Sequence, residues 1–256
     1  MNRPGSRWLA ATALLVGLAG LAELAEAQDT RSDTGLEGSI GIALLDTDRF
    51  PGSEERRQRL IPAIDLTLND RYYFRFTRLG AWLWQSEDYG RDHGWRAGPA
   101  LRPRFRVTPP PSVPDDDKEE RPFSLDTGLS IQLKHRWLDW SFSLFGDGFQ
   151  RHEGHSAEIS VSSFLPFNER VRLLPALSLE YESARLSRFY YAVDEQPLPD
   201  AAFIPGVSLL LLARTGERSL VTLGIFANRQ PSDRQRSGLV ASRSSVTAVA
   251  GLSYRF

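Results

Sequence analysis

The chain lacks several features that would place it in a common class of protein. None of its 256 residues is cysteine, so no disulfide framework holds it together. Its formal net charge is −1, which argues against the basic surface that a nucleic-acid partner requires. No segment after residue 27 has the roughly 20 consecutive apolar residues of a transmembrane helix. What remains is a long, nearly neutral chain without disulfides or spanning helices.

The N-terminus carries an export signal. Arg3 and Arg7 precede an uncharged run of 15 residues, Trp8–Ala22, and the small residues Ala25 and Ala27 follow. This order predicts a secretory signal peptide, residues 1–27, cleaved after Ala27. A retained N-terminal anchor is the alternative, but the run is shorter than the roughly 20 residues that span a bilayer. No cysteine follows the cleavage site, which excludes a lipoprotein anchor.

Residues 28–256 fit one large domain, and their dominant pattern is a two-residue alternation of apolar and polar side chains. The last segment shows it most clearly, since one side of an extended chain carries Val246, Ala248, Ala250, Leu252, Tyr254 and Phe256. Val249 is the exception on the other, polar side. The alternating segments run about 9–13 residues, the length of tilted transmembrane strands rather than the 5–6 residues usual in soluble sheets. We therefore expect an all-β fold, an antiparallel transmembrane β-barrel.

The strand count follows from the loops. Short turns near Asn69, Arg136, Asn168 and Gly216 alternate with long loops, as in barrels with periplasmic turns and external loops. Eleven alternating segments are visible, whereas two periplasmic termini require an even number. The alternation loses its phase around 78–80, so a missed reversal there would give twelve strands. Ten strands is the alternative if the first two segments are wrongly assigned as a pair of strands.

The polar sides of the strands carry charges that would line the barrel interior. We expect the following charges there: Arg96, Arg102, Arg104, Arg106, Asp65, Asp126, Asp139, Glu158 and Glu180. The arginine row could line an anion channel, or it could pair with the acids. Wide channels open at about 16–18 strands, while small barrels are filled by side chains. The sequence therefore favours a filled lumen held by ion pairs.

Aromatic residues suit the two interfacial girdles of such a barrel. We assign the following to them: Trp82, Trp84, Trp95, Trp137, Trp140, Tyr181 and Tyr254. The segment 108–122 is rich in proline and acidic residues and is expected to be a long loop.

Histidines are the main candidates for chemistry. His152 and His155 could suggest a metal site, but they lie in a predicted loop without a third ligand nearby in sequence. A solvated loop is the favoured interpretation, with no metal and no cofactor. Four histidines are candidate catalytic bases, His93, His135, His152 and His155, but no serine-centred motif accompanies them. We predict that the protein is not an enzyme, with a lipid hydrolase as the least favoured alternative.

Local sequences add a family resemblance. Leu252, Tyr254 and Phe256 resemble the closing strand that the barrel-assembly machinery recognises in outer-membrane proteins. Matching segments run through most of the mature chain: Phe50-Pro51-Gly52-Ser53, Gly98-Pro99-Ala100-Leu101, Gly154-His155, Tyr190-Tyr191-Ala192-Val193 and Gly251–Phe256. In their order and spacing they resemble the MipA/OmpV family of outer-membrane proteins. Ala192 departs from the glycine usual in the family motif of Tyr190, Tyr191 and Val193.

The resemblance implies a barrel in the Gram-negative outer membrane, in contact with its lipid, that acts as a scaffold. Its partners would be murein enzymes, a lytic transglycosylase and a penicillin-binding protein. A small-solute or ion channel is the alternative function.

Overall fold

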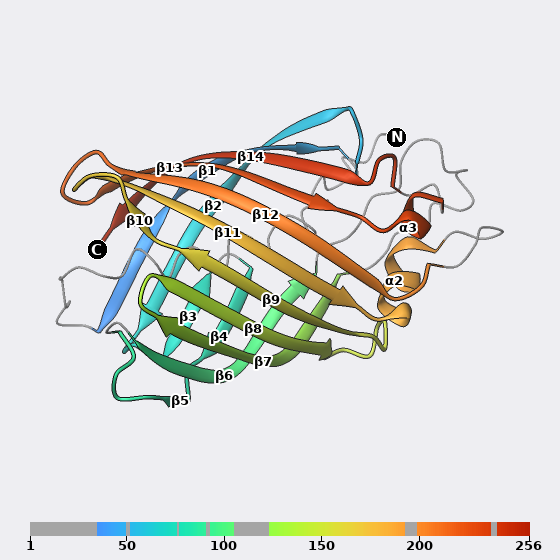
Figure 1. Ribbon diagram of the computed structural model, residues 1–256, viewed down its shortest axis with the longest axis horizontal. Helices are drawn as coiled ribbons and strands as arrows, with labels where there is room; N and C mark the ends of the chain where they lie inside the picture. The colour runs from blue at the N-terminus through green and yellow to red at the C-terminus, as the bar shows by residue number, and fades with distance from the viewer. Residues whose placement is uncertain are drawn as a thin grey trace, which may run out of the picture.

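A closed, antiparallel β-barrel forms the described part of the protein (Figure 1). The computed structural model describes residues 35–49, 52–75, 77–90, 93–104, 123–192, 199–236 and 240–256. The predicted signal peptide, with Ala25 and Ala27, therefore lies outside the described residues, as do the whole 108–122 loop, Arg106 and Val193.

Twelve strands build the barrel over the described residues, two of them interrupted. In chain order they are β1 (Leu36–Asp48), β2 (Arg56–Leu68), β3 (Tyr72–Arg75), β4 (Arg78–Ala81) continued by β5 (Trp84–Gln85), β6 (His93–Arg104), β7 (Ser124–His135), β8 (Leu138–Asp147), β9 (His155–Ser163) continued by β10 (Leu165–Pro166), β11 (Val171–Glu182), β12 (Ala202–Arg214), β13 (Ser219–Arg229) and β14 (Ser244–Arg255). Each strand pairs antiparallel with its neighbours, and β14 closes the sheet on β1. The prediction of twelve strands is confirmed.

The strand that sequence reading missed is a short hairpin. The chain reverses between Arg75 and Arg78, just before the stretch where the alternation loses its phase, and β3 and β4 have four residues each. Because β3 pairs with β2 only over Asp65–Leu68, the stretch 56–64 pairs with β1 alone among the described residues. Pro62 lies in this stretch, where its missing N–H is tolerated at a sheet edge.

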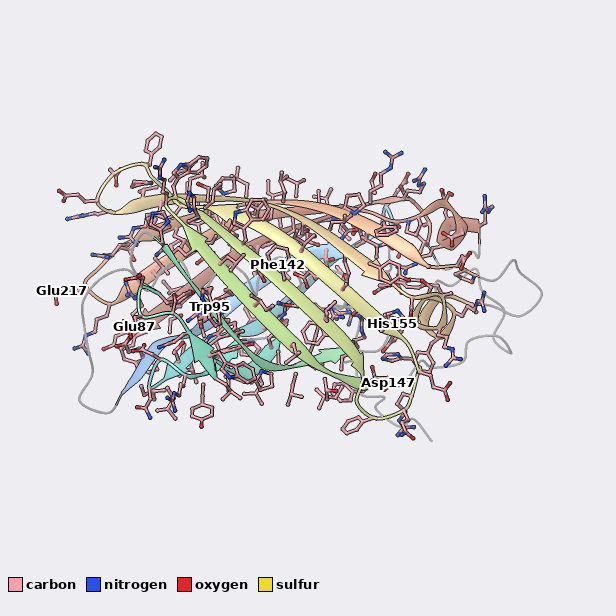
Figure 2. The ribbon with its side chains drawn as sticks, turned by 60° about the horizontal axis from the view of Figure 1, so that its bottom comes forward. Glu87, Trp95, Phe142, Asp147, His155 and Glu217 are labelled. Carbon is pink, nitrogen blue, oxygen red and sulfur yellow. The ribbon has the colours of Figure 1, made fainter. Side chains whose placement is uncertain are left out.

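Short turns gather at the end of the barrel that carries the C-terminus (Figure 1). Asn69 and Asp70 both have positive φ, 53° and 55°, which tight hairpin turns require. Figure 2 shows Glu87 and Glu217 at this end and Asp147 and His155 toward the other. The helices α2 (Ala184–Tyr191) and α3 (Ser232–Arg236) lie at the opposite end, in segments expected to be loops. In the described part of the chain, no helix is long and apolar enough to cross a membrane.

The outer surface of the barrel is apolar, as the alternation predicts. Large apolar side chains point outward and are exposed, among them Leu60 at 67 %, Leu144 at 63 % and Leu177 at 60 %. Their polar neighbours in sequence point inward, so the usual arrangement of a soluble protein is inverted. Such a surface suits hydrocarbon.

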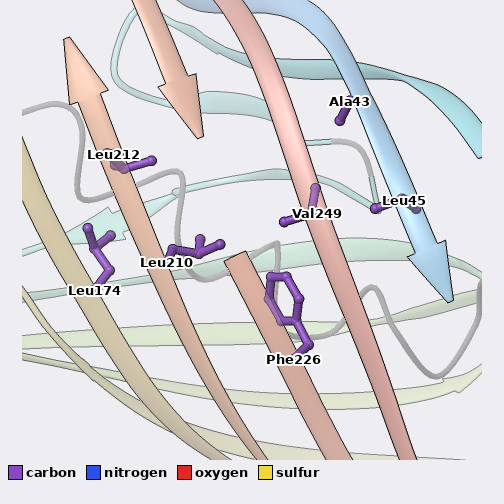
Figure 3. Close-up of a cluster of buried hydrophobic side chains, with 7 residues drawn as sticks. All are labelled: Ala43, Leu45, Leu174, Leu210, Leu212, Phe226 and Val249. Carbon is purple, nitrogen blue, oxygen red and sulfur yellow. The ribbon is translucent and has the colours of Figure 1, made fainter. Parts of the chain in front are cut away.

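One side of the interior is also apolar, which the alternation does not predict. This apolar wall consists of Ala43, Leu45, Leu174, Leu210, Leu212, Phe226 and Val249, all buried (Figure 3). Its side chains come from five neighbouring strands, β11 to β14 and β1. Val249, the exception in the terminal strand, therefore has a partner surface inside the barrel.

Candidate functional site

A network of buried charges also lies in the interior, on β4, β6, β7, β9 and β11. This ionic wall consists of Arg78, Arg102, Arg104, Asp126, Glu158, Glu180 and Glu182, each at most 8 % exposed. All seven lie on the polar side of their strands, which the two-residue period turns toward the interior.

Two arginines of β6 hold the centre of the ionic wall. Arg104 donates through Nε to Asp126 Oδ2 at 2.6 Å and through Nη1 to Glu182 Oε1 at 3.0 Å. Arg102 donates through Nη1 to Glu180 Oε1 at 3.0 Å, and its Nη2 lies 3.4 Å from Asp126 Oδ2. Because β7, β8 and β9 separate β6 from β11 in the sheet, the pairs with Glu180 and Glu182 cross the interior.

A second pair spans the interior from the short hairpin. Arg78 of β4 donates to Glu158 of β9, and through Nη1 to Ser143 Oγ at 3.3 Å. The ring of Phe145 lies 5.5 Å from the guanidinium carbon of Arg78 and 4.4 Å from that of Arg102. The aromatic face therefore lies beside two arginines, an arrangement that stabilises desolvated cations.

His152 is buried against the ionic wall, so the expectation of a solvated loop is wrong for this residue. Its Nε2 lies 2.9 Å from Asp126 Oδ1, and its Nδ1 accepts the Gly154 N–H at 3.0 Å. The loop folds inward around the Asp147 carboxylate, which accepts the backbone N–H of Glu153 at 2.8 Å. Since both ring nitrogens are engaged, His152 presents no free lone pair to a substrate or metal. His155 is exposed, as expected.

Tyr190 and Tyr191 of the family motif lie in a cap that α2 and α3 form at the loop end of the barrel. Tyr190 and Tyr191 of α2 are buried, and the Tyr190 hydroxyl lies 2.9 Å from Ser124 Oγ. Burial raises the pKa of Tyr190 to about 12, and it raises the pKa of Tyr191 as well. Arg234 of α3 is buried and donates to Glu182, which joins the cap to the ionic wall. Burial lowers the pKa of Arg234, but Glu182, Tyr191 and Glu180 together outweigh burial and leave that pKa above its ordinary value.

Arg96 occupies the interior nearer the short turns. Its Nε donates to Gln132 Oε1 at 2.6 Å, and its guanidinium carbon lies 4.4 Å from both the Trp82 and Tyr89 rings. Trp82 is 2 % exposed and stacks on Tyr73, so its assignment to an aromatic girdle is wrong. The alternation does not indicate that the Trp82 side chain points inward, because the reversal of the chain before Arg78 changes the phase.

The remaining predicted residues have simpler surroundings. Asp65 lies 3.5 Å from Arg75 Nε, and Asp139 is half-buried. Leu252 and Tyr254 are exposed on the outer face of β14, and Phe256 continues the pairing by exchanging backbone hydrogen bonds with Gly38.

Histidines of the short-turn end form a pair that the sequence does not indicate. Across β6 and β7, His93 Nδ1 lies 3.0 Å from His135 Nδ1. Among the residues that the structure describes, no group of three or more His, Cys, Asp and Glu side chains could hold a metal ion.

Several interior residues could have been found from breaks in the alternation. Apolar pairs such as Leu44-Leu45 and the run Leu209–Leu212 place one apolar side chain on each face, and the inward members belong to the apolar wall. Arg78 lies where the alternation loses its phase, and Glu182 lies where a predicted strand gives way to a predicted loop. No local signal indicates Arg234 or His152, because loop folding places them.

A closed antiparallel sheet with an apolar exterior and a charged interior defines a transmembrane β-barrel. The model of the family "MltA-interacting protein MipA" matches residues 40–256. The chain therefore belongs to the MipA family, and the resemblance proposed from the sequence is confirmed.

A named relative and two solved structures are also similar to this chain. YiaT of Escherichia coli (strain K12), named as an outer membrane protein, is 26 % identical over 237 residues, covering 88 % of this chain and 93 % of YiaT. Among solved structures, an OmpT loop-deletion mutant of Vibrio cholerae covers 88 % of this chain and all of its own, with a TM-score of 0.45 and 7 % identity. The outer membrane channel DcaP of Acinetobacter baumannii covers 89 % of this chain and 99 % of its own, with a TM-score of 0.42 and 8 % identity. This chain is an outer-membrane protein; likenesses this remote say nothing of activity.

Proposed function

We propose that this barrel is a non-enzymatic interaction protein with a closed lumen, and that it binds a lytic transglycosylase at its periplasmic end. The observation that carries the proposal is the set of ion pairs that cross the interior, Arg78 with Glu158, Arg102 with Glu180 and Arg104 with Glu182. If paired, buried charges fill the lumen, the two rims of the barrel remain as the surfaces that can bind a partner. The family name, which refers to interaction with MltA, supports the choice of partner.

A closed lumen has a direct electrical test. Removing one member of a buried ion pair is costly, so the pairs resist opening. In planar lipid bilayers we expect no stable conductance steps from the wild-type barrel. Large, long-lived conductance steps would contradict the proposal that the lumen is closed.

Basic residues on one sector of the periplasmic rim offer a surface for the partner. Arg172 of β11 lies within electrostatic range of Arg214 and Arg255, so three positive charges gather at the ends of β11, β12 and β14. Arg170 and Arg218 lie in or beside the adjoining turns. Such a sector would attract an acidic protein surface, and its contribution would weaken as salt screens it.

Crosslinking in intact envelopes tests this docking. We expect Arg172→Glu with Arg214→Glu to reduce recovery of a lytic transglycosylase at least tenfold, because the reversed charges repel an acidic partner. Arg185→Glu is the matched control, since Arg185 is exposed at the loop end. Equal recovery of the transglycosylase with the wild type, the double variant and Arg185→Glu would contradict the proposed docking surface. Failure to recover any murein enzyme from the wild type, including a penicillin-binding protein, would contradict the function.

Export and assembly are part of the proposal. The signal peptide would be removed after Ala27, and Leu252, Tyr254 and Phe256 would present the closing strand to the assembly machinery. N-terminal sequencing should start at Gln28, and deletion of Phe256 should lower the amount of folded barrel in the outer membrane.

A small-solute or anion channel is the second candidate function. It is favoured by Arg59, whose Nε and Nη2 are buried without a hydrogen-bond partner among the described residues, beside Arg57. A passing anion could neutralise this site. Conductance that falls on Arg59→Gln would favour the channel over the scaffold.

A further inference from the structure

Two exposed histidines face each other at the short-turn end of the barrel. His93 begins β6 and His135 ends β7, and they are direct partners across the strand pair. Their Nδ1 atoms are 3.0 Å apart, their ring centroids are 4.6 Å apart, and the ring planes are inclined by 59°. Both side chains lie on the outer face, each two residues from an exposed apolar residue, Trp95 or Leu133.

We propose that His93 and His135 form a binding site for a divalent transition-metal ion, with a preference for Cu²⁺ or Ni²⁺ over Zn²⁺. In the metal-free protein, one Nδ1 carries a proton and donates it to the other. When a metal ion binds, that proton moves through water to Nε2 of its own ring, and the ion accepts the lone pairs of both Nδ1 atoms. The site is independent of the proposed scaffold function.

The distance between the nitrogens sets the preference. For metal–nitrogen bonds of about 2.0–2.1 Å, nitrogens 3.0 Å apart subtend about 90–97° at the metal. That angle matches adjacent positions of square-planar or tetragonal coordination, which Cu²⁺ and Ni²⁺ adopt. A tetrahedral Zn²⁺ site would need the nitrogens about 3.3 Å apart.

The sheet preorganises the pair. Directly opposed residues on antiparallel strands have Cβ atoms about 4.5–5.5 Å apart, so pairing of β6 with β7 holds the two rings together before metal binds. Both rings are exposed, and rotation about their side-chain bonds at an unchanged nitrogen separation points both lone pairs at one ion. Two protein ligands leave the other positions to water, so the bound ion should exchange readily.

The test uses the untagged mature protein refolded in detergent micelles and titrated with Cu²⁺. Trp95 and Trp137 each lie two residues from a ligand and report binding by fluorescence quenching. We expect one Cu²⁺ per barrel, with an electron paramagnetic resonance spectrum that shows two equivalent nitrogen ligands. His93→Asn and His135→Asn should each weaken binding at least tenfold, whereas the control His155→Asn should not change it.

A second measurement needs no variant. Diethyl pyrocarbonate modifies accessible imidazoles, and Cu²⁺ should protect His93 and His135 of the wild type while His155 reacts. Zn²⁺ should protect them only at higher concentration. Unchanged affinity in either ligand variant, equal protection of all three histidines, or tighter binding of Zn²⁺ than of Cu²⁺ would overturn the site.

Discussion

The two walls of the barrel interior differ in chemistry although one sheet encloses both. The apolar wall packs leucines, Phe226 and Val249 from five adjacent strands, whereas the ionic wall joins strands that are not neighbours through paired charges. Apolar contacts tolerate changes that keep their volume, while a buried ion pair depends on both partners. The apolar wall therefore resembles an ordinary protein core, and the ionic wall acts as a set of crosslinks across the lumen.

The largest effect is expected from Asp126, which accepts from both β6 arginines and His152. Asp126→Ala should lower the free energy of unfolding by about 3–5 kcal/mol, because Arg102, Arg104 and His152 all lose a buried carboxylate partner. Urea unfolding of the refolded barrel measures this. Asp46→Ala is the control: its partner Arg56 is exposed, so its cost should stay below about 1 kcal/mol. Similar costs for both variants would remove the distinction between buried and surface pairs.

Leu174 tests the apolar wall. Leu174→Ala should cost about 2–5 kcal/mol, the loss of apolar transfer plus a cavity, because this side chain is fully buried. Leu177→Ala is matched on the same strand, but Leu177 faces outward, so it should lose only the transfer contribution, roughly 2 kcal/mol or less. Unfolding titrations in the same detergent compare the two. If Leu177→Ala proves as costly as Leu174→Ala, the inner wall is not closely packed.

The cap above the ionic wall should respond to alkaline pH. Because the pKa of Tyr190 is raised to about 12, the folded protein binds this proton more tightly than the unfolded chain does. The resulting stabilisation is complete below the unfolded pKa of about 10 and is lost as the pH rises toward 12. At pH 11 the wild type should have lost about 1 kcal/mol more than Tyr190→Phe. Parallel pH profiles of the two proteins would show that Tyr190 is not buried.

The smallest effect is expected from the double variant Arg78→Met with Glu158→Leu, which converts part of the ionic wall into apolar wall. Glu158→Leu alone should lower the free energy of unfolding by about 3 kcal/mol or more, since it leaves the buried guanidinium of Arg78 without its carboxylate partner. Arg78→Met combined with Glu158→Leu should return to within about 1 kcal/mol of the wild type, because apolar groups of similar volume can replace a buried pair. A double-mutant cycle measures the coupling. A double variant as unstable as Glu158→Leu would indicate that the pair holds the β3–β4 hairpin in place.

Much of this architecture was predictable, because a strand repeats its orientation every two residues. The alternation from Val246 to Phe256 placed Leu252 and Tyr254 outward, where the structure has them. The same period predicted that Arg102, Arg104, Asp126 and Glu180 point inward, and the structure buries all four. The reversal before Arg78 was located only to within a few residues, because a four-residue strand is too short to show a period.

The amino-acid sequence by itself determined the barrel and the inward direction of its charges, since these depend on period and length. The positions of its turns favoured twelve strands over ten. Only the tertiary structure decided which charges pair, because the partners of Arg78, Arg102 and Arg104 lie about 22–80 residues away in the chain and meet only when the sheet closes. It also decided that His152 is buried and that His93 meets His135, because loop folding and strand register set those contacts.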